Sequence, residues 1–257
     1  MPISYIAVEG QHDAALIGCL LSNGGFSLLK KRGFVDPAFE RYYVQKLQDS
    51  LVGRPADCHY WKRGEHSVAL HPVGGDSQLV VAGATVSAQI IGPMDSLGFF
   101  IDADQDSPVN RFQKLIEDVL KMKSQPGFQF PSDAGLVHEG PPRCGVFVFP
   151  NNQDQGAIEA ILESCAEVAY PDLFSKSLDY LQSIDRDQLI TTEQRRLASG
   201  SNEKKARLSV IGSILSPAAA IQNTIREDRW VCDATLSLSF ISNVRAFLRE
   251  LLNEPTI

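Results

Sequence analysis

Residues 4–21, SYIAVEGQHDAALIGCLL, contain the change of pattern that decides the fold. The run opens with a short apolar segment typical of a buried strand and continues with apolar residues at helical spacing. Two carboxylates, Glu9 and Asp13, lie at the junction. A strand that leads directly into a helix is half of a β–α–β unit, the unit from which parallel sheets are built.

The same succession recurs along the first 170 residues. The segment 77–92 fits either a strand or a helix, and its length and small residues favour a helix. We therefore predict an α/β fold with a compact parallel sheet flanked by helices. The further predicted strands are 67–75, 96–106 and 144–150, and the further predicted helices are 108–123 and 155–169.

Strand patterns nearly vanish beyond residue 170, where helical patterns follow at 174–184, 203–215 and 237–253. We predict a core at 1–170 and a mostly helical region at 171–257 that packs on it. Several polar segments fit less well. Residues 36–51 suggest a short helix, 53–66 a loop within a candidate insertion at 24–66, and 186–205 an exposed connection.

Composition narrows the class of protein. A net charge of −7 argues against a general nucleic-acid coat protein, although not against an enzyme that acts on nucleic acid. No apolar run approaches the roughly 20 residues that span a bilayer, and no signal peptide is recognisable, so we expect a cytoplasmic protein without membrane contact. The five cysteines form no CxxC pair, which suggests neither a zinc ribbon nor a disulfide framework.

Acidic residues follow the predicted strands. Glu9 closes the first strand, the pair Asp102 and Asp104 closes the strand at 96–106, and Glu159 lies beyond the strand at 144–150. Ligands bind at the carboxyl ends of strands in open parallel sheets, where such acids would meet. Carboxylates suit Mg²⁺ or Mn²⁺ better than zinc. We expect Gly10 to allow a sharp turn that leaves Glu9 facing this edge.

Each acid also has an ordinary structural interpretation. Asp13 suits the first turn of a helix, where the helix dipole favours a negative charge. Asp102 and Asp104, with Asp106 beyond them, fit a polar strand end or an Asx turn. Glu159 fits an exposed helix face equally well. The recurrence of acids at several strand ends favours a metal site held by Glu9, Asp13, Asp102, Asp104 and Glu159.

The motif VEG after a short strand, with DxD after a later one, resembles the Toprim domain of topoisomerases, bacterial primases and OLD-family nucleases. The resemblance implies that Glu9 serves acid–base chemistry and metal binding, and that Asp102 and Asp104 bind Mg²⁺. The OLD-type ExxxD motif matches Glu9 and Asp13. Its SxxE motif falls on GAIE, where Gly156 replaces serine and Glu159 keeps the acid.

The resemblance extends over most of the chain. The OLD-type nucleases carry a downstream lysine, for which Lys204 and Lys205 are both candidates. The stretches FPNNQDQGAIEAIL and NEKKARLSVIG also resemble small, stand-alone, uncharacterised Toprim-like proteins of the DUF3226 type. No GxxxxGK[ST] motif is present, so we expect no P-loop ATPase within these 257 residues.

Three functions remain open at this point. The leading one is Mg²⁺- or Mn²⁺-dependent phosphodiester hydrolysis on DNA or RNA, in defence or nucleic-acid processing, with Lys204 or Lys205 neutralising charge on the phosphate. The second is a non-catalytic module that binds a metal or a partner, such as a separate ATPase or a second copy of the chain. The third is a primase-like nucleotidyl transferase that uses the same ions.

Overall fold

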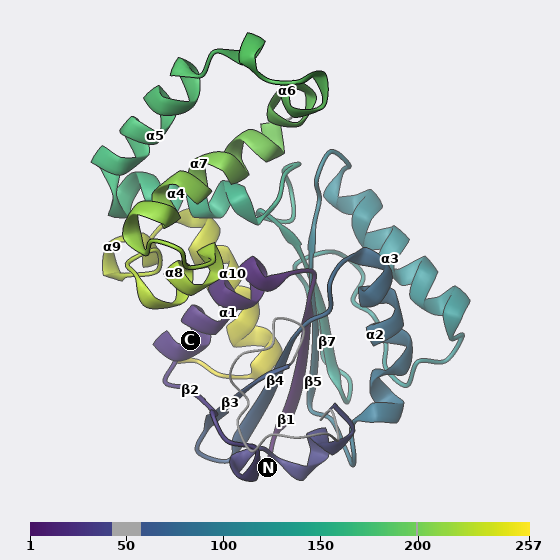
Figure 1. Ribbon diagram of the computed structural model, residues 1–257. Coiled ribbons are helices and arrows are strands. Elements are labelled where there is room, and N and C mark those ends of the chain that lie inside the picture. The colour runs from purple at the N-terminus through teal and green to yellow at the C-terminus, as the bar shows by residue number, and fades with distance from the viewer. Residues whose placement is uncertain (43–57, 199) are drawn as a thin grey trace.

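The computed structural model describes residues 1–42, 58–198 and 200–257 (Figure 1). In this part of the chain a seven-stranded sheet has the order β2-β3-β4-β1-β5-β7-β6. The strands are β1 (Ile3–Val8), β2 (Ser27–Leu28), β3 (His59–Arg63), β4 (His66–Pro72), β5 (Ser96–Asp102), β6 (Val137–His138) and β7 (Arg143–Phe149).

The centre of the sheet is parallel and its margins are antiparallel. Strands β4, β1, β5 and β7 run in one direction, whereas β3, β2 and β6 pair antiparallel with their neighbours. Every residue of β1 is buried, because both faces of this strand are covered. The mostly apolar run ISYIAV is the pattern expected of a strand that is buried on both faces.

Helices cover both faces of the sheet (Figure 1). Successive strand residues point to opposite faces, so Ile6 and Phe100 enter one apolar cluster while Tyr5 and Phe99 enter the other. The cluster around Ile6 packs against α1 (Gln11–Asn23), α4 (Ile158–Ala169) and α10 (Ser239–Leu252). The cluster around Tyr5 packs against α2 (Asp76–Gln89) and α3 (Pro108–Met122).

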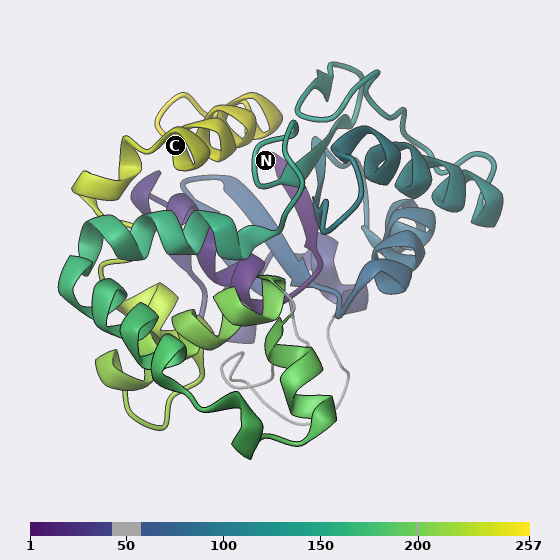
Figure 2. The ribbon, with the colours of Figure 1, turned by 90° about the horizontal axis from the view of Figure 1, so that it is seen from above.

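The helices between α4 and α10 form a group beside the sheet, and part of this group extends past its upper edge (Figures 1 and 2). Helix α7 contacts α4, α5 and α6. This places α7 near the carboxyl ends of the parallel strands, because α4 begins there. The group comprises α5 (Pro171–Ser183), η3 (Arg186–Gln188), α6 (Thr191–Ala198), α7 (Gly200–Leu215), α8 (Ile221–Glu227) and α9 (Asp233–Leu236).

The α/β prediction is confirmed, including the helical choice for residues 77–92, which form most of α2. The prediction of a loop at 53–66 is wrong for its described part, because β3 pairs with β4 and buries Tyr60 and Trp61. Lysine and arginine at the end of β3 hid the strand pattern. The short strands β2 and β6 were not predicted at all.

The described part of the connection predicted at 186–205 is largely exposed, as expected, but it is helical, because η3, α6 and the beginning of α7 occupy it. Helix α6 is polar and begins where the Glu193 carboxylate accepts a hydrogen bond from the Ile190 N–H, a local cap that apolar periodicity does not show. Of the helix suggested at 36–51, the first part forms the 3₁₀ helix η2 (Pro37–Tyr42), which follows η1 (Arg32–Phe34). The remainder of that segment lies outside the described residues.

No helix among the described residues combines the length and apolar character needed to cross a membrane.

Helix α10 packs closely against one face of the sheet. The Phe247 ring lies 5.4 Å from both the Phe100 and Phe147 rings, measured between centroids. A Cβ added at Gly145 of β7 would stand 2.7 Å from Phe247 Cζ. Gly145 therefore leaves the space that this ring fills.

We predict that Gly145→Ala lowers the free energy of unfolding by about 1–3 kcal/mol, because the rigid, packed ring cannot move aside without strain. Urea unfolding followed by circular dichroism measures the change. Gly33→Ala is the control, since a Cβ at Gly33 meets no atom within 4 Å. Equal midpoints for the two variants would contradict this account of the α10 interface.

Candidate functional site

The carboxyl ends of β1 and β5 meet the first turns of α1 and α4. Glu9 follows β1 directly, and its Oε1 accepts a hydrogen bond of 2.9 Å from the backbone N–H of Asp102, the last residue of β5. Asp102 Oδ1 in turn accepts 3.0 Å from the Ile158 N–H at the start of α4. These two bonds tie adjacent strand ends to the helix that carries Glu159. We call Glu9, Asp13, Asp102 and Glu159 the acid rim.

Asp13 is buried by its place in the first turn of α1. Its Oδ2 accepts a hydrogen bond of 2.7 Å from the Gly10 N–H, and the residue is only 4% exposed. The helix-start interpretation of Asp13 thus holds alongside the proposed site. The turn predicted for Gly10 is wrong, because its φ of −142° and ψ of −175° are extended backbone open to any residue.

Glu159 lies in the first turn of α4 and is 3% exposed. Its Oε1 is 3.7 Å from Lys205 Nζ and 3.9 Å from His12 Nδ1. Its Oε2 is buried and has no hydrogen-bond partner. Lys204 Nζ instead lies 3.4 Å from Glu163 Oε2, one turn farther along α4. Lys205 is therefore the lysine of the pair that reaches the acid rim.

Burial and mutual repulsion shift the rim acids. Burial raises the pKa of Asp13 to about 8, with further upward contributions from the charges of Glu9 and Glu159. Burial and then the Asp102 charge raise the pKa of Glu9 to about 8. Burial raises the pKa of Asp102 well above its usual range, reinforced by Asp13 and Glu159. The rim therefore favours a bound proton or a cation.

Glu159 behaves differently from its neighbours. Burial acts to raise its pKa, but the nearby His12 imidazole and the charge of Lys205 outweigh it and leave the pKa below the usual range. Glu159 is the ionised member of the acid rim.

Arg111 of α3 is a rim component that the sequence prediction missed. Its Nε donates 2.8 Å to the Asp102 carbonyl, and its Nη2 lies 3.2 Å from Glu9 Oε1. Both terminal nitrogens also bind the Asp76 carboxylate at 2.7 Å, which lowers the pKa of Asp76. Nothing in the sequence distinguishes Arg111 from a surface arginine on an amphipathic helix. The sequence prediction also missed His12, because no motif marks it as a neighbour of Glu159.

Three other acids take separate positions. Asp104 is exposed, with a φ of +54°, and its backbone N–H donates 2.7 Å to the Gly156 carbonyl. Asp106 accepts hydrogen bonds from the Ser107 N–H and the Asn110 amide at the start of α3, as the Asx interpretation expects. Asp154 is exposed and accepts from the Asn151 amide. The structure brings Asp104 to the margin of the acid rim, outside its buried part.

The backbone conformation explains why the GAIE segment has a glycine at position 156. Gly156 has a φ of +133°, a region that L-residues rarely adopt, so the serine expected there would be strained.

The donor set of the acid rim consists of carboxylate oxygens, which suits a hard cation such as Mg²⁺. The buried and unpartnered Glu159 Oε2 provides a free acceptor in that set. The other rim carboxylates are engaged by backbone amides and by Arg111. Within residues 1–42, 58–198 and 200–257, no group of three or more His, Cys, Asp or Glu side chains is already arranged around a cation position.

A serine–histidine–glutamate chain at the opposite edge of the sheet has a structural role. Ser4 Oγ lies 2.8 Å from His66 Nε2, and His66 Nδ1 lies 2.8 Å from Glu254 Oε1. Ser4 is fully buried, so no substrate reaches its hydroxyl. The chain fastens the segment after α10 to the beginning of β1 and β4.

Comparisons with known proteins agree with this architecture. The model of the family described as a protein of unknown function (DUF3226) matches residues 3–253, and the chain belongs to that family. A solved structure of a hypothetical protein from Pyrococcus horikoshii OT3 covers 98% of this chain and 95% of its own, with a TM-score of 0.51 and 15% identity. That likeness shows a shared fold. No curated protein matches significantly.

We predict that Asp13→Asn stabilises the protein at neutral pH in the presence of EDTA. The pKa of Asp13 is raised by folding, so its stabilising effect is complete below pH 4 and is lost as the pH rises toward 8. The melting temperature of the variant, relative to wild type, should therefore increase between pH 5 and 8. Asp154→Asn, at an exposed acid, is the control. A difference between Asp13→Asn and wild type that does not change with pH would contradict the shift.

Proposed function

We propose that this member of the DUF3226 family is a phosphodiesterase that hydrolyses DNA or RNA at the acid rim with Mg²⁺ or Mn²⁺. The observation that carries the proposal is the convergence of four buried or partly buried carboxylates, three with raised pKa values, at the carboxyl edge of a parallel sheet. Maintaining such repulsion costs stability, which natural proteins tolerate mainly where function requires it.

Glu9, Asp13, Asp102 and Glu159 would hold the cation, with Asp104 at the exposed margin. A bound divalent ion supplies charge neutralisation, Lewis acidity toward the phosphate and activation of water. The resemblance of VEG and DxD to Toprim domains of the OLD-type nucleases supports the same assignment. The all-oxygen donor set and the unpartnered Glu159 Oε2 support it independently.

The chain itself supplies positioning and charge. Glu9, with a pKa of about 8, holds or releases a proton close to neutral pH, which suits a general acid or base. Arg111 orients Glu9 through its Nη2 and holds the end of β5 through the Asp102 carbonyl. Lys205 is 51% exposed in its side chain, so its ammonium can also contact a phosphate that approaches Glu159.

A second candidate function is a non-catalytic module that binds a cation or a separate partner, such as an ATPase. The observation that favours it is the Arg111 network, because Glu9 and Asp76 already share a cationic side chain. In that case Arg111 is the permanent counter-ion of the rim, and the resemblance to nucleases reflects the fold alone. A primase-like transferase would use the same residues and is distinguished by nucleotide incorporation.

We predict that the purified protein cleaves plasmid, single-stranded DNA or RNA when Mg²⁺ or Mn²⁺ is present. Glu9→Gln and Asp102→Asn should each lower the rate at least about 100-fold, because each removes an oxygen ligand and a rim charge. Asp154→Asn, an exposed acid near the rim, should retain the wild-type rate. Gel assays with and without EDTA measure the cleavage.

Two outcomes would reject this assignment. Cleavage that survives both rim substitutions would place the activity elsewhere. An absence of cleavage on all three substrates, with folded protein and either ion, would favour the binding module.

The two lysines provide a sharper comparison. We predict that Lys205→Ala lowers kcat at least about tenfold, whereas Lys204→Ala changes it less than about threefold, because only Lys205 reaches Glu159. Single-turnover cleavage on the best substrate measures both rates. A larger loss with Lys204→Ala would reverse the assignment.

Cation binding should depend on pH. Since the pKa values of Glu9 and Asp13 are about 8, Mn²⁺ must displace protons, and its affinity should rise from pH 6 to pH 8 and then level off. Titration calorimetry in buffers of different ionisation enthalpy counts the released protons. Binding that releases no proton at pH 7 would contradict the protonated state of the rim.

A further inference from the structure

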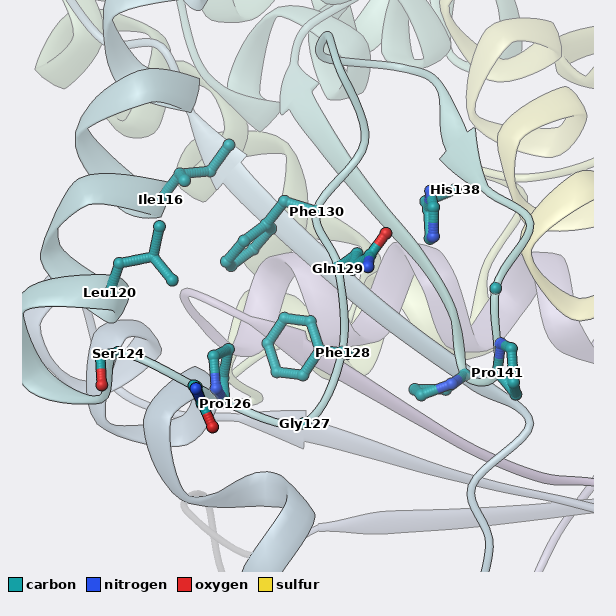
Figure 3. A pocket seen from close by; sticks show the side chains of 13 residues that line it. Ile116, Leu120, Ser124, Pro126, Gly127, Phe128, Gln129, Phe130, His138 and Pro141 are labelled. Carbon is teal, nitrogen blue, oxygen red and sulfur yellow. The ribbon is translucent and has the colours of Figure 1, made fainter.

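A cavity lies beside the C-terminal half of α3 (Figure 3), whereas Arg111 at the other end of this helix contacts the acid rim. It has a volume of about 760 Å³ and is lined by the last turns of α3, by residues 124–130 and by residues just before β7. Pro142 precedes the first residue of β7, so the cavity sits toward the amino edge of the sheet. Its volume falls within the range of about 300–1,000 Å³ typical of small-molecule sites.

One wall of the cavity is aromatic and fixed in place. The Phe128 and Phe130 rings pack edge to face with centroids 5.0 Å apart. Both also pack on Phe99 of β5, at 6.2 and 5.9 Å. The Ser87 hydroxyl of α2 donates a hydrogen bond to the Pro126 carbonyl, which anchors the segment before the rings. These contacts within the protein hold the aromatic wall in place without a ligand.

Polar groups lie across the same segment from the rings. Figure 3 shows Phe128 and Phe130 on the side that faces α3, while Gln129 points to the other side, toward His138 and Pro141. In the described part of the chain, no hydrogen bond occupies the Gln129 amide or the His138 ring. A Cβ at position 140 would stand 2.7 Å from His138 Nε2, so Gly140 makes room for the imidazole.

The charge of the lining restricts the ligand. Aromatic, proline and aliphatic side chains share the cavity with serine, glutamine and histidine, and no Asp, Glu, Lys or Arg lines it. A charged ligand would lose its hydration without gaining an ionic partner. On the side of Gln129 and His138, a flat ring can pack on proline, and hydrogen-bonding atoms on its edge can pair with an amide and an imidazole.

We propose that this cavity binds a neutral, planar heteroaromatic ring with a hydrogen-bonding edge, of the size of a purine base. Pro141 contacts its face, Gln129 and His138 recognise its edge, and Phe128 and Phe130 hold the segment that carries Gln129 from the α3 side. The inference is independent of the acid rim and of the proposed nuclease activity, because the two sites lie at opposite ends of α3.

The probe is 9-methyladenine, titrated into the full-length protein without metal and followed by amide chemical shifts. We expect saturable shifts confined to residues 126–130 and 138–142. Gln129→Leu should weaken the binding about fivefold, the effect of one neutral hydrogen bond. Gln182→Leu, the same change on the exposed surface of α5, should leave the affinity unchanged. Phe128→Ala should also weaken binding, and its spectrum reports whether it folds.

Three results would overturn the proposal. They are the absence of saturable shifts at millimolar probe, shifts outside the cavity residues, and equal affinity of the wild-type and Gln129→Leu proteins. Toluene is the ligand control, and toluene binding as tight as that of 9-methyladenine would refute recognition of a polar edge. Nuclease assays of Gln129→Leu should match wild type, so loss of one site is separable from loss of the other.

Discussion

The hydrogen bond from the Asp102 N–H to Glu9 Oε1 brings the acids of two neighbouring strands together at one edge of the sheet. Two neutral residues would close the same strand ends at lower electrostatic cost. Here the carboxylates lie close enough to raise one another's pKa, in a place from which water is largely excluded. Arg111 offsets part of this repulsion on the α3 side, and Lys205 and His12 offset part on the α4 side.

The rest of the fold supports this junction. Strand β1 is buried along its whole length between two helical layers, so Glu9 emerges from a rigid element. Asp102 binds the first turn of α4, which positions Glu159, and α7 packs on α4 and brings Lys205 to the same place. The helical C-terminal region thus contributes the Lys205 ammonium to a site whose acids come from the ends of β1 and β5 and from α1 and α4. The aromatic cavity at the other end of α3 shares none of these residues.

Periodicity was sufficient to predict the parts of the fold in which apolar residues repeat over several turns or a full strand. β1, β5, β7 and the amphipathic α3 fall in this class. It failed where pairing or capping replaces periodicity, as in β3, whose half-buried end is basic, and α6, which buries no apolar face. Strands of two residues, such as β2 and β6, are defined by their partners and carry no pattern of their own.

The site could be predicted in part for a similar reason. Parallel strands end at a common edge, so acids directly after strands were expected to be neighbours, and Glu9 and Asp102 are. The choice between Lys204 and Lys205 required the packing of α7 on α4. Arg111 required the side-chain path from α3 back to the end of β5. The sequence does not tell which glycine is required by its backbone conformation. The φ values show that Gly156 is and that Gly10 is not.

The central claim is that the acid rim binds a divalent cation. A crystal structure of the protein soaked in Mn²⁺, with anomalous diffraction, tests it most directly. The account predicts an anomalous peak about 2.0–2.6 Å from carboxylate oxygens of Asp102 and at least one of Glu9, Asp13 and Glu159. The account would be contradicted if no anomalous peak appeared at the rim and the carboxylates kept their hydrogen bonds to backbone amides and Arg111.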